Sequence, residues 1–213
     1  MKFETFRTHF GKQPYFTLQD VLRHPVAKGV ERVQLSHWVK AGKVLRLKKG
    51  IYALADALQD KKTSAWFLAE VLYPPSYISL HTALSYYGMI PEAVFSTTCI
   101  STRKTKKFKN TLGSFEYRHL APAHFFGFTR CKENSGNSYL MATPEKALLD
   151  FIYLEIPYRQ ILDRELYEDS YRFAHFEQLS NKILTGYMNQ FHSPKLCKAL
   201  PLLLALCKEH QHD

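Results

Sequence analysis

The segment from Phe16 to Leu54 constrains the fold of this chain more than any other part of its sequence. Two amphipathic stretches come first, and two short apolar runs separated by Lys-Lys-Gly follow them. Apolar residues at helical spacing predict helices, and a pair of apolar runs around a glycine turn predicts a β-hairpin. Helix, turn, helix and hairpin in this order are typical of a winged helix-turn-helix, whose second helix can enter the major groove of DNA.

Local signals set the expected limits of the two helices. Thr17 and Asp20 have the spacing of a capping box, which predicts that Thr17 caps the first helix, and Pro25 should end it. The second helix is expected over Glu31–Ala41, with Gly29 as a weak N-terminal cap. The two helices therefore enclose a short turn, as the winged helix-turn-helix requires.

The expected second helix has one apolar face and one face suited to DNA. Leu35, Trp38 and Val39 fall within an arc of roughly 100° and should face the core. The opposite arc holds cationic, hydroxyl and methyl-bearing side chains, which can contact phosphates or base edges. Lys48 and Lys49 at the hairpin turn suit contacts to phosphates. The predicted DNA-binding residues are Thr17, Arg32, Val33, Gln34, Ser36, His37, Lys40, Lys43, Arg46, Lys48 and Lys49.

Positive charge is concentrated in the same part of the chain. Residues 1–55 hold eleven Lys and Arg side chains against three Asp and Glu, a net charge of +8, while the whole chain carries +10. An excess of cations on a helix-turn-helix is expected of a protein that binds phosphates. Similar helix pairs also serve as packing units or bind proteins, so a protein-binding winged helix stays an alternative.

Several classes of protein and site are disfavoured by the sequence. It has no run of about 18 apolar residues for a membrane span and no signal-peptide core, so a cytoplasmic protein is expected. No pair among the four cysteines has the C-x-x-C spacing of a zinc knuckle. The sequence also lacks a phosphate-binding loop and a Gly-x-Ser-x-Gly elbow. We therefore expect no metal, no cofactor and no catalytic site.

A polar stretch at Asp56–Lys62 marks the expected boundary between a first domain, residues 1–57, and a second domain, residues 58–213. The pattern after it predicts helices at about 63–72 and 80–87, strands at 95–101, 115–120, 125–131 and 138–141, a helix from Pro144, and mostly helices from about 159. The expected fold class is α+β: a winged helix-turn-helix followed by a domain with a small antiparallel sheet and C-terminal helices.

A second basic patch is expected in the second domain. It consists of Arg103, Lys104, Lys106, Lys107 and Lys109. Five cations so close together are typical of a contact to nucleic acid or to an acidic partner. A solvated connection between two strands would have the same composition, and the sequence leaves these interpretations open.

A metal-dependent nuclease of a defence system is a further alternative. Such enzymes place acidic residues and a lysine on a pair of strands. Glu116 is expected in mid-strand, but Glu145 and Lys146 are adjacent at the start of a helix. Because this spacing does not fit, the sequence favours a binding protein over an enzyme.

With both domains considered, the chain resembles the AbiEi family of antitoxins from bacterial abortive-infection loci, which are type IV toxin–antitoxin systems. In the first domain the resemblance lies in FTLQDV and LSHWVKAGKVLRLKKGIYAL. In the second domain it lies in YISLHTALSYYGMIPE, STRKTKKFK, FFGF and YLMATPEKALLDFIY. The second set is the more specific, because many families share the winged helix.

The resemblance implies a division of labour between the domains. The winged domain would bind inverted repeats in the promoter of its own operon and repress transcription, as a monomer or a weak dimer on DNA. The second domain would act as antitoxin against a nucleotidyltransferase-like toxin involved in phage defence. A stable complex with that toxin need not form in such systems.

Overall fold

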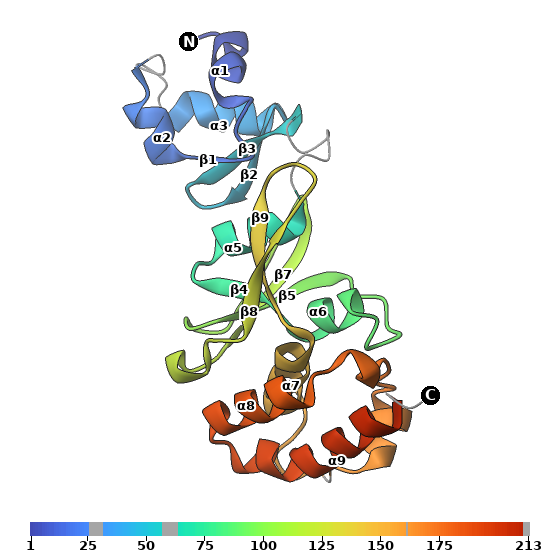
Figure 1. Ribbon diagram of the computed structural model, residues 1–213. Coiled ribbons are helices and arrows are strands. Elements are labelled where there is room, and N and C mark those ends of the chain that lie inside the picture. Colours follow the sequence, from blue (N-terminus) through green and yellow to red (C-terminus); the bar gives the residue numbers. More distant parts are fainter. Residues whose placement is uncertain (26–31, 57–63, 161, 211–213) are drawn as a thin grey trace.

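The computed structural model describes residues 1–25, 32–56, 64–160 and 162–210. A small N-terminal domain, a central sheet and a set of C-terminal helices follow one another along the molecule (Figure 1). The expected α+β class is confirmed. The weak cap Gly29, the first residue of the predicted second helix, Glu31, and the predicted boundary at residues 57–58 lie outside the described residues.

The N-terminal domain has the order of elements of a winged helix-turn-helix. Its elements are α1 (Phe3–Phe10), β1 (Phe16–Thr17), α2 (Leu18–Arg23), α3 (Arg32–Lys40), β2 (Val44–Lys48) and β3 (Ile51–Leu54). The three strands form an antiparallel sheet in the order β1-β3-β2. The strands β2 and β3 are the predicted hairpin, which we call the wing.

Helix α1 was not expected from the sequence, and aromatic packing explains it. Phe6 and Phe10 are fully buried on one face of α1, and their rings stack 4.5 Å apart. The ring of Phe6 also lies 4.8 Å from that of Trp38 on α3 and 5.3 Å from that of Phe16. So short a helix is marginal on its own and depends on this packing.

The second domain is built on a six-stranded sheet in the order β6-β7-β5-β4-β9-β8. Its strands are β4 (Ser76–Ile78), β5 (Ser96–Ser101), β6 (Lys106–Asn110), β7 (Gly113–His119), β8 (Phe128–Lys132) and β9 (Ser138–Ala142). The sheet is larger than predicted and mixed, because β4 pairs with β9 and β5 pairs with β7 in parallel. The two strands absent from the sequence prediction are β4, which has only three residues, and β6, which carries the second basic patch.

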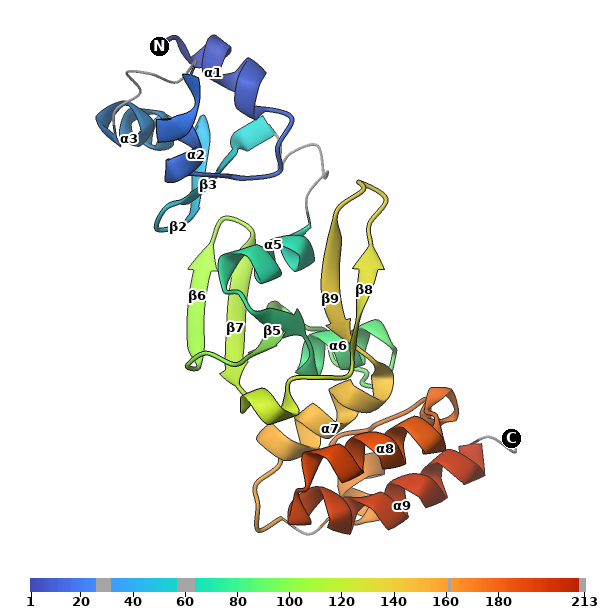
Figure 2. The same ribbon diagram turned by 60° about the vertical axis from the view of Figure 1, so that its left-hand side comes forward.

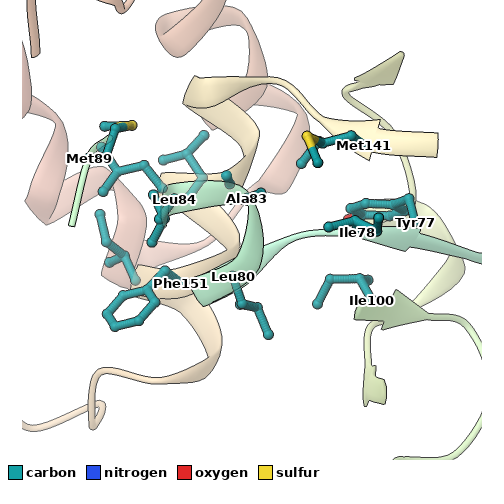
Figure 3. Packing of buried hydrophobic residues seen from close by; sticks show 14 of the residues in the cluster. Tyr77, Ile78, Leu80, Ala83, Leu84, Met89, Ile100, Met141 and Phe151 are labelled. Atoms are coloured by element: carbon teal, nitrogen blue, oxygen red, sulfur yellow. The ribbon is translucent and has the colours of Figure 1, made fainter. Parts of the chain in front are cut away.

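Helices cover this sheet and continue beyond it. Helices α5 (Ala65–Leu72) and α6 (Leu80–Tyr86) lie near the sheet, and α7 (Pro144–Leu154) follows β9. Helices α8 (Asn181–Phe191) and α9 (Pro194–His210) come last among the described elements. Three short helical turns complete the described part of the domain: η2 (Pro122–His124) before β8, and η3 (Leu166–Ser170) and η4 (Phe176–Gln178) between α7 and α8. Leu80 and Leu84 of α6 pack near Phe151 of α7, while Ile78 and Met141 come from the sheet (Figure 3). The predicted start of α7 at Pro144 is confirmed, with Thr143 accepting a hydrogen bond from the Lys146 amide.

Candidate nucleic-acid interface

Helix α3 exposes the face that the sequence predicts for DNA. Its buried residues are Leu35 and Trp38, with 2% and 8% of their surface exposed. The opposite residues Arg32, Val33, Ser36, His37 and Lys40 are all exposed. Val33 is 60% exposed, so its methyl groups are accessible on this face. The face therefore combines cations, small polar groups and one methyl-bearing side chain.

A groove lies between α2, α3 and the wing. Its volume is about 820 Å³, and its lining includes three exposed cations, Arg32 from α3 with Arg46 and Lys49 from the wing. Gly50 at the turn has a φ of +85°, a conformation that a glycine adopts without strain. The wing thus brings Arg46 and Lys49 beside Arg32 at the start of α3. The sequence predicted that Arg46 and Lys49 share a hairpin, but not that they lie next to α3.

Three predicted residues at the edge of this face hold the domain together. Thr17 and Asp20 form the predicted capping box, since the Asp20 amide donates to Thr17 Oγ1 at 3.2 Å and the Thr17 amide donates to Asp20 Oδ2 at 2.7 Å. Gln34 Nε2 donates to the Met1 carbonyl at 2.7 Å. The ammonium of Lys43 lies 4.9 Å from the centre of the Phe3 ring. The capping box orders the start of α2, while the contacts of Gln34 and Lys43 hold Met1 and α1 against α3 and the residues after it.

Lys48 at the end of β2 contacts the second domain of its own chain. Its ammonium donates to the carbonyl of Leu72, the last residue of α5, at 2.7 Å, and it lies 5.1 Å from the centre of the Tyr73 ring. Burial, followed by repulsion from Arg103 and Lys106, lowers the pKa of Lys48. The structure therefore separates Lys48 from Arg46 and Lys49, which remain exposed.

The wing also joins the second domain through its backbone and its apolar side chains. The side-chain amide of Asn110, at the end of β6, donates to the Leu47 carbonyl at 3.1 Å. Leu47 and Ala53 belong to the main hydrophobic core, the one built around the six-stranded sheet. Tyr73 and Asn110 are the residues of this junction that the sequence did not indicate, because their partners lie in another domain.

The second basic patch lies next to this junction. Its five cations, Arg103, Lys104, Lys106, Lys107 and Lys109, are all exposed, on β6 and on the loop before it. Strand β6 is an edge strand that lies beside β2 of the wing (Figure 2). A cavity of about 710 Å³ lies at the loop, between Arg103, Lys104 and His119. The two basic surfaces predicted separately are therefore neighbours in space.

The residues considered for a nuclease are held in other contacts. Glu116 pairs with Lys107, with 2.7 Å between carboxylate and ammonium. Glu145 is buried and accepts from the amide of Ser180 at 2.9 Å. Among the described residues, no group of three or more His, Cys, Asp or Glu side chains is placed to hold a metal ion. In the same residues, no helix is long and apolar enough to cross a membrane.

A buried ion pair connects α7 with the sheet. Lys146 and Asp150 are both fully buried and paired with each other. Tyr77 and Ser79 donate hydroxyl hydrogen bonds to Asp150 at 2.9 and 2.8 Å. Burial lowers the pKa of Lys146 and raises the pKa of Asp150, and the pairing opposes both shifts. Both charged side chains are closed off from solvent, so this cluster belongs to the interior of the second domain.

Comparison with known proteins identifies the first domain. Residues 7–55 match the family model described as transcriptional regulator, AbiEi antitoxin. The match runs from within α1 to the end of the wing and supports the resemblance to the AbiEi family seen in the sequence of this domain. It supports a role as a DNA-binding regulator of transcription. None of the curated proteins compared matches the chain.

Proposed function

We propose that this chain, a transcriptional regulator of the AbiEi type, represses its own operon by binding inverted repeats in the promoter. The observation that carries the proposal is the exposed face of α3 beside the cations of the wing. A helix of this kind fits the major groove, and the flanking cations can neutralise phosphates on either side. Two monomers, or a weak dimer, would occupy the two half-sites.

The side chains of this face suit different tasks. Arg32 and Lys40 can bond guanine or phosphate, while Ser36 and His37 reach base edges and the methyl groups of Val33 suit a thymine methyl. Arg46 and Lys49 would contact phosphates without reading sequence. Contacts of the first kind should decide which sequence is bound, and contacts of the second kind should decide how steeply binding depends on salt.

The second basic patch would extend the same interface. Arg103, Lys104, Lys106 and Lys109 form no ion pair within the described part of the chain, so their charges are available to a polyanion. Because the patch adjoins the wing, DNA lying in the α3 site would pass close to it. An acidic protein is the other partner that this charge would suit.

The second domain would supply the antitoxin activity against a nucleotidyltransferase-like toxin. Support comes from the description of the matched family, which names an antitoxin, although the match covers residues 7–55 alone. If a nucleotidyltransferase-like protein is encoded beside this chain, co-expression of the two tests this part: the full chain should restore growth that the toxin alone arrests. Growth arrest that persists with the full chain would contradict the antitoxin role.

A mobility-shift titration on the upstream DNA of the operon tests the DNA-binding face. Arg32→Ala and His37→Ala should reduce the preference for the operator over unrelated DNA, while Arg46→Ala with Lys49→Ala should weaken binding to both. Lys198→Ala is the matched control, since it removes an exposed charge from the remote helix α9. If a variant combining all four changes binds the operator like the parent, the proposed face is wrong.

A further inference from the structure

Tyr73 lies where the wing meets the second domain, and two cations from different domains converge on its ring. The ammonium of Lys48 is 5.1 Å from the ring centre, and the guanidinium carbon of Arg103 is 4.5 Å from it. The Tyr73 hydroxyl donates to the Lys104 carbonyl at 3.0 Å, which fixes the loop before β6. Tyr73 itself is buried, with 6% of its surface exposed. One side chain therefore contacts both basic surfaces.

Without the ring, the cations at this junction would repel one another. Lys48 is close enough to Arg103 and Lys106 for both to lower its pKa. Within the residues that the structure describes, none of these three side chains pairs with a carboxylate. The negative face of an aromatic ring attracts cations, and more so where water is excluded. The ring of Tyr73 therefore offsets a repulsion that would otherwise separate the wing from β6.

A fixed distance between the wing and β6 should strengthen the binding of a ligand with regularly spaced charges, such as duplex DNA. Two cationic surfaces that move independently lose conformational freedom when one duplex binds both, and that loss weakens binding. Surfaces held in advance at the right separation avoid the loss. The hydrogen bonds from Lys48 to Leu72 and from Asn110 to Leu47 hold the wing against the second domain in the same way.

We infer that Tyr73 is a positioning residue of the DNA interface: it holds the wing and the second basic patch at one separation, so that a single duplex contacts both domains. The inference rests on the proposed function, because it assumes that the winged domain binds duplex DNA. Tyr73 itself touches no DNA. Its removal should therefore act only on duplexes long enough to reach the second basic patch.

The test compares two duplexes from the upstream region with the full-length protein. The short one covers a single half-site of about one helical turn, ~10 base pairs, and the long one adds about one more turn on the side of the second domain. For Tyr73→Leu, we expect a roughly tenfold loss of affinity on the long duplex, with a salt dependence shallower by about two phosphate contacts, and no change on the short one. Tyr73→Phe keeps the ring and loses only the hydrogen bond to the Lys104 carbonyl, so its loss on the long duplex should be much smaller than that of Tyr73→Leu.

Two further variants make the result specific. Asn110→Ala removes one of the hydrogen bonds that hold the wing without removing a ring or a cation, and it should show a smaller loss that is also confined to the long duplex. Tyr158→Leu is the matched control, because Tyr158 is 73% exposed and remote in sequence from the junction. Unfolding curves of each variant establish that it folds. If Tyr73→Leu fails to fold, Tyr73→Phe and Asn110→Ala together decide the question: no loss on the long duplex in either variant overturns the inference.

The outcomes separate this inference from the proposed function. If the parent binds neither duplex, the proposed function is wrong and the inference falls with it. If the parent binds both and the folded variants lose nothing, or lose equally on short and long duplexes, only the positioning role of Tyr73 is wrong. A loss confined to the long duplex supports both.

Discussion

Replacing Lys146 by methionine should destabilise the second domain severely, because it leaves a buried carboxylate without its cation. Lys146 and Asp150 are each 0% exposed, and the side chain of Lys146 is surrounded by the rings of Tyr77, Phe126 and Phe191, between 4.6 and 5.4 Å from its ammonium. Methionine can fill this apolar space, so the main effect of Lys146→Met is electrostatic rather than a cavity.

The expected cost follows from what remains around Asp150. Two hydroxyl hydrogen bonds, from Tyr77 and Ser79, stay in place, but no cation does. Removing one partner of a buried ion pair costs about 3–5 kcal/mol. Domains of this kind have a total free energy of unfolding of about 5–15 kcal/mol, so Lys146→Met should remove a large part of it. Lys146→Met with Asp150→Asn removes both charges and keeps an acceptor for the hydroxyls, and it should recover about 2 kcal/mol or more.

The pH dependence of the stability of Lys146→Met tests the same electrostatic argument in a second way. Without Lys146, only the hydrogen bonds from Tyr77 and Ser79 oppose the effect of burial, so the pKa of Asp150 in the folded protein lies further above its unfolded value. The folded state then binds the proton more tightly than the unfolded state, so stability falls as pH rises from the unfolded pKa to the folded pKa. The deficit of Lys146→Met should therefore be largest at neutral pH and shrink as the pH is lowered towards the ordinary carboxyl range.

Urea denaturation followed by tryptophan fluorescence measures these differences. Each domain holds one tryptophan, so a Trp38→Phe background leaves Trp66, packed 5.5 Å from the Tyr139 ring, to report on the second domain. Lys195→Met is the matched control, since Lys195 is also buried but, within the described part of the chain, its ammonium bonds to the carbonyls of Tyr153 and Ile156 and to no carboxylate. It should cost less, about 1–3 kcal/mol. A loss under ~1 kcal/mol for Lys146→Met, or a double variant no more stable than the single one, would refute the charge argument.

Three other predictions concern single positions. Val33→Glu should abolish operator binding in a mobility-shift assay by placing a negative charge on the α3 face, yet shift the free energy of unfolding by less than about 0.5 kcal/mol, since Val33 is 60% exposed; retained binding would exclude Val33 from the interface. Thr17→Ala should cost about 1 kcal/mol in urea unfolding followed at Trp38, because it removes the capping box of α2, and an unchanged midpoint would show that the box contributes nothing. Gly127→Ala should lower the thermal midpoint of the second domain, because its φ is +74° and a Cβ would lie 3.0 Å from the Lys146 and Tyr187 side chains. Gly136→Ala is the control: its φ of +84° is similar, but a Cβ there would meet no neighbouring atom of the described residues within 4 Å. The difference between the two variants measures the steric contribution to the loss of stability.

The parts of the fold that the sequence predicts are those specified by neighbouring residues. The capping box of Thr17 and Asp20 fixes the start of α2, and the spacing of Leu35 and Trp38 fixes which face of α3 is buried. Both signals act within one turn or one face of a helix. The exposed face of α3 follows from them, so the exposure of Arg32, Val33, Ser36, His37 and Lys40 could be predicted, while their contact with DNA stays a prediction.

Elements that depend on distant partners could not be predicted in this way. Strand β6 has lysines at 106, 107 and 109 and a single aromatic, Phe108, and this pattern suits a solvated loop equally well. It becomes a strand because it pairs with β7, where the Phe108 ring stacks 5.9 and 5.3 Å from those of Phe115 and Tyr117. The parallel pairing of β5 with β7 likewise depends on how the chain returns, which strand composition does not encode.

The position of Lys48 shows how one backbone irregularity changes the meaning of a basic motif. In a regular strand Arg46 and Lys48 would point to the same face, and both were predicted to bind DNA. The pairing of β2 with β3 shifts register between these two residues, and such a bulge re-aims the side chain that follows it. Lys48 consequently reaches the Leu72 carbonyl, 24 residues further along the chain. Every residue has a backbone carbonyl, so the sequence does not indicate which carbonyl will accept a hydrogen bond from a lysine. The sequence alone therefore cannot distinguish a lysine that joins two domains from one that binds DNA; the strand register is needed.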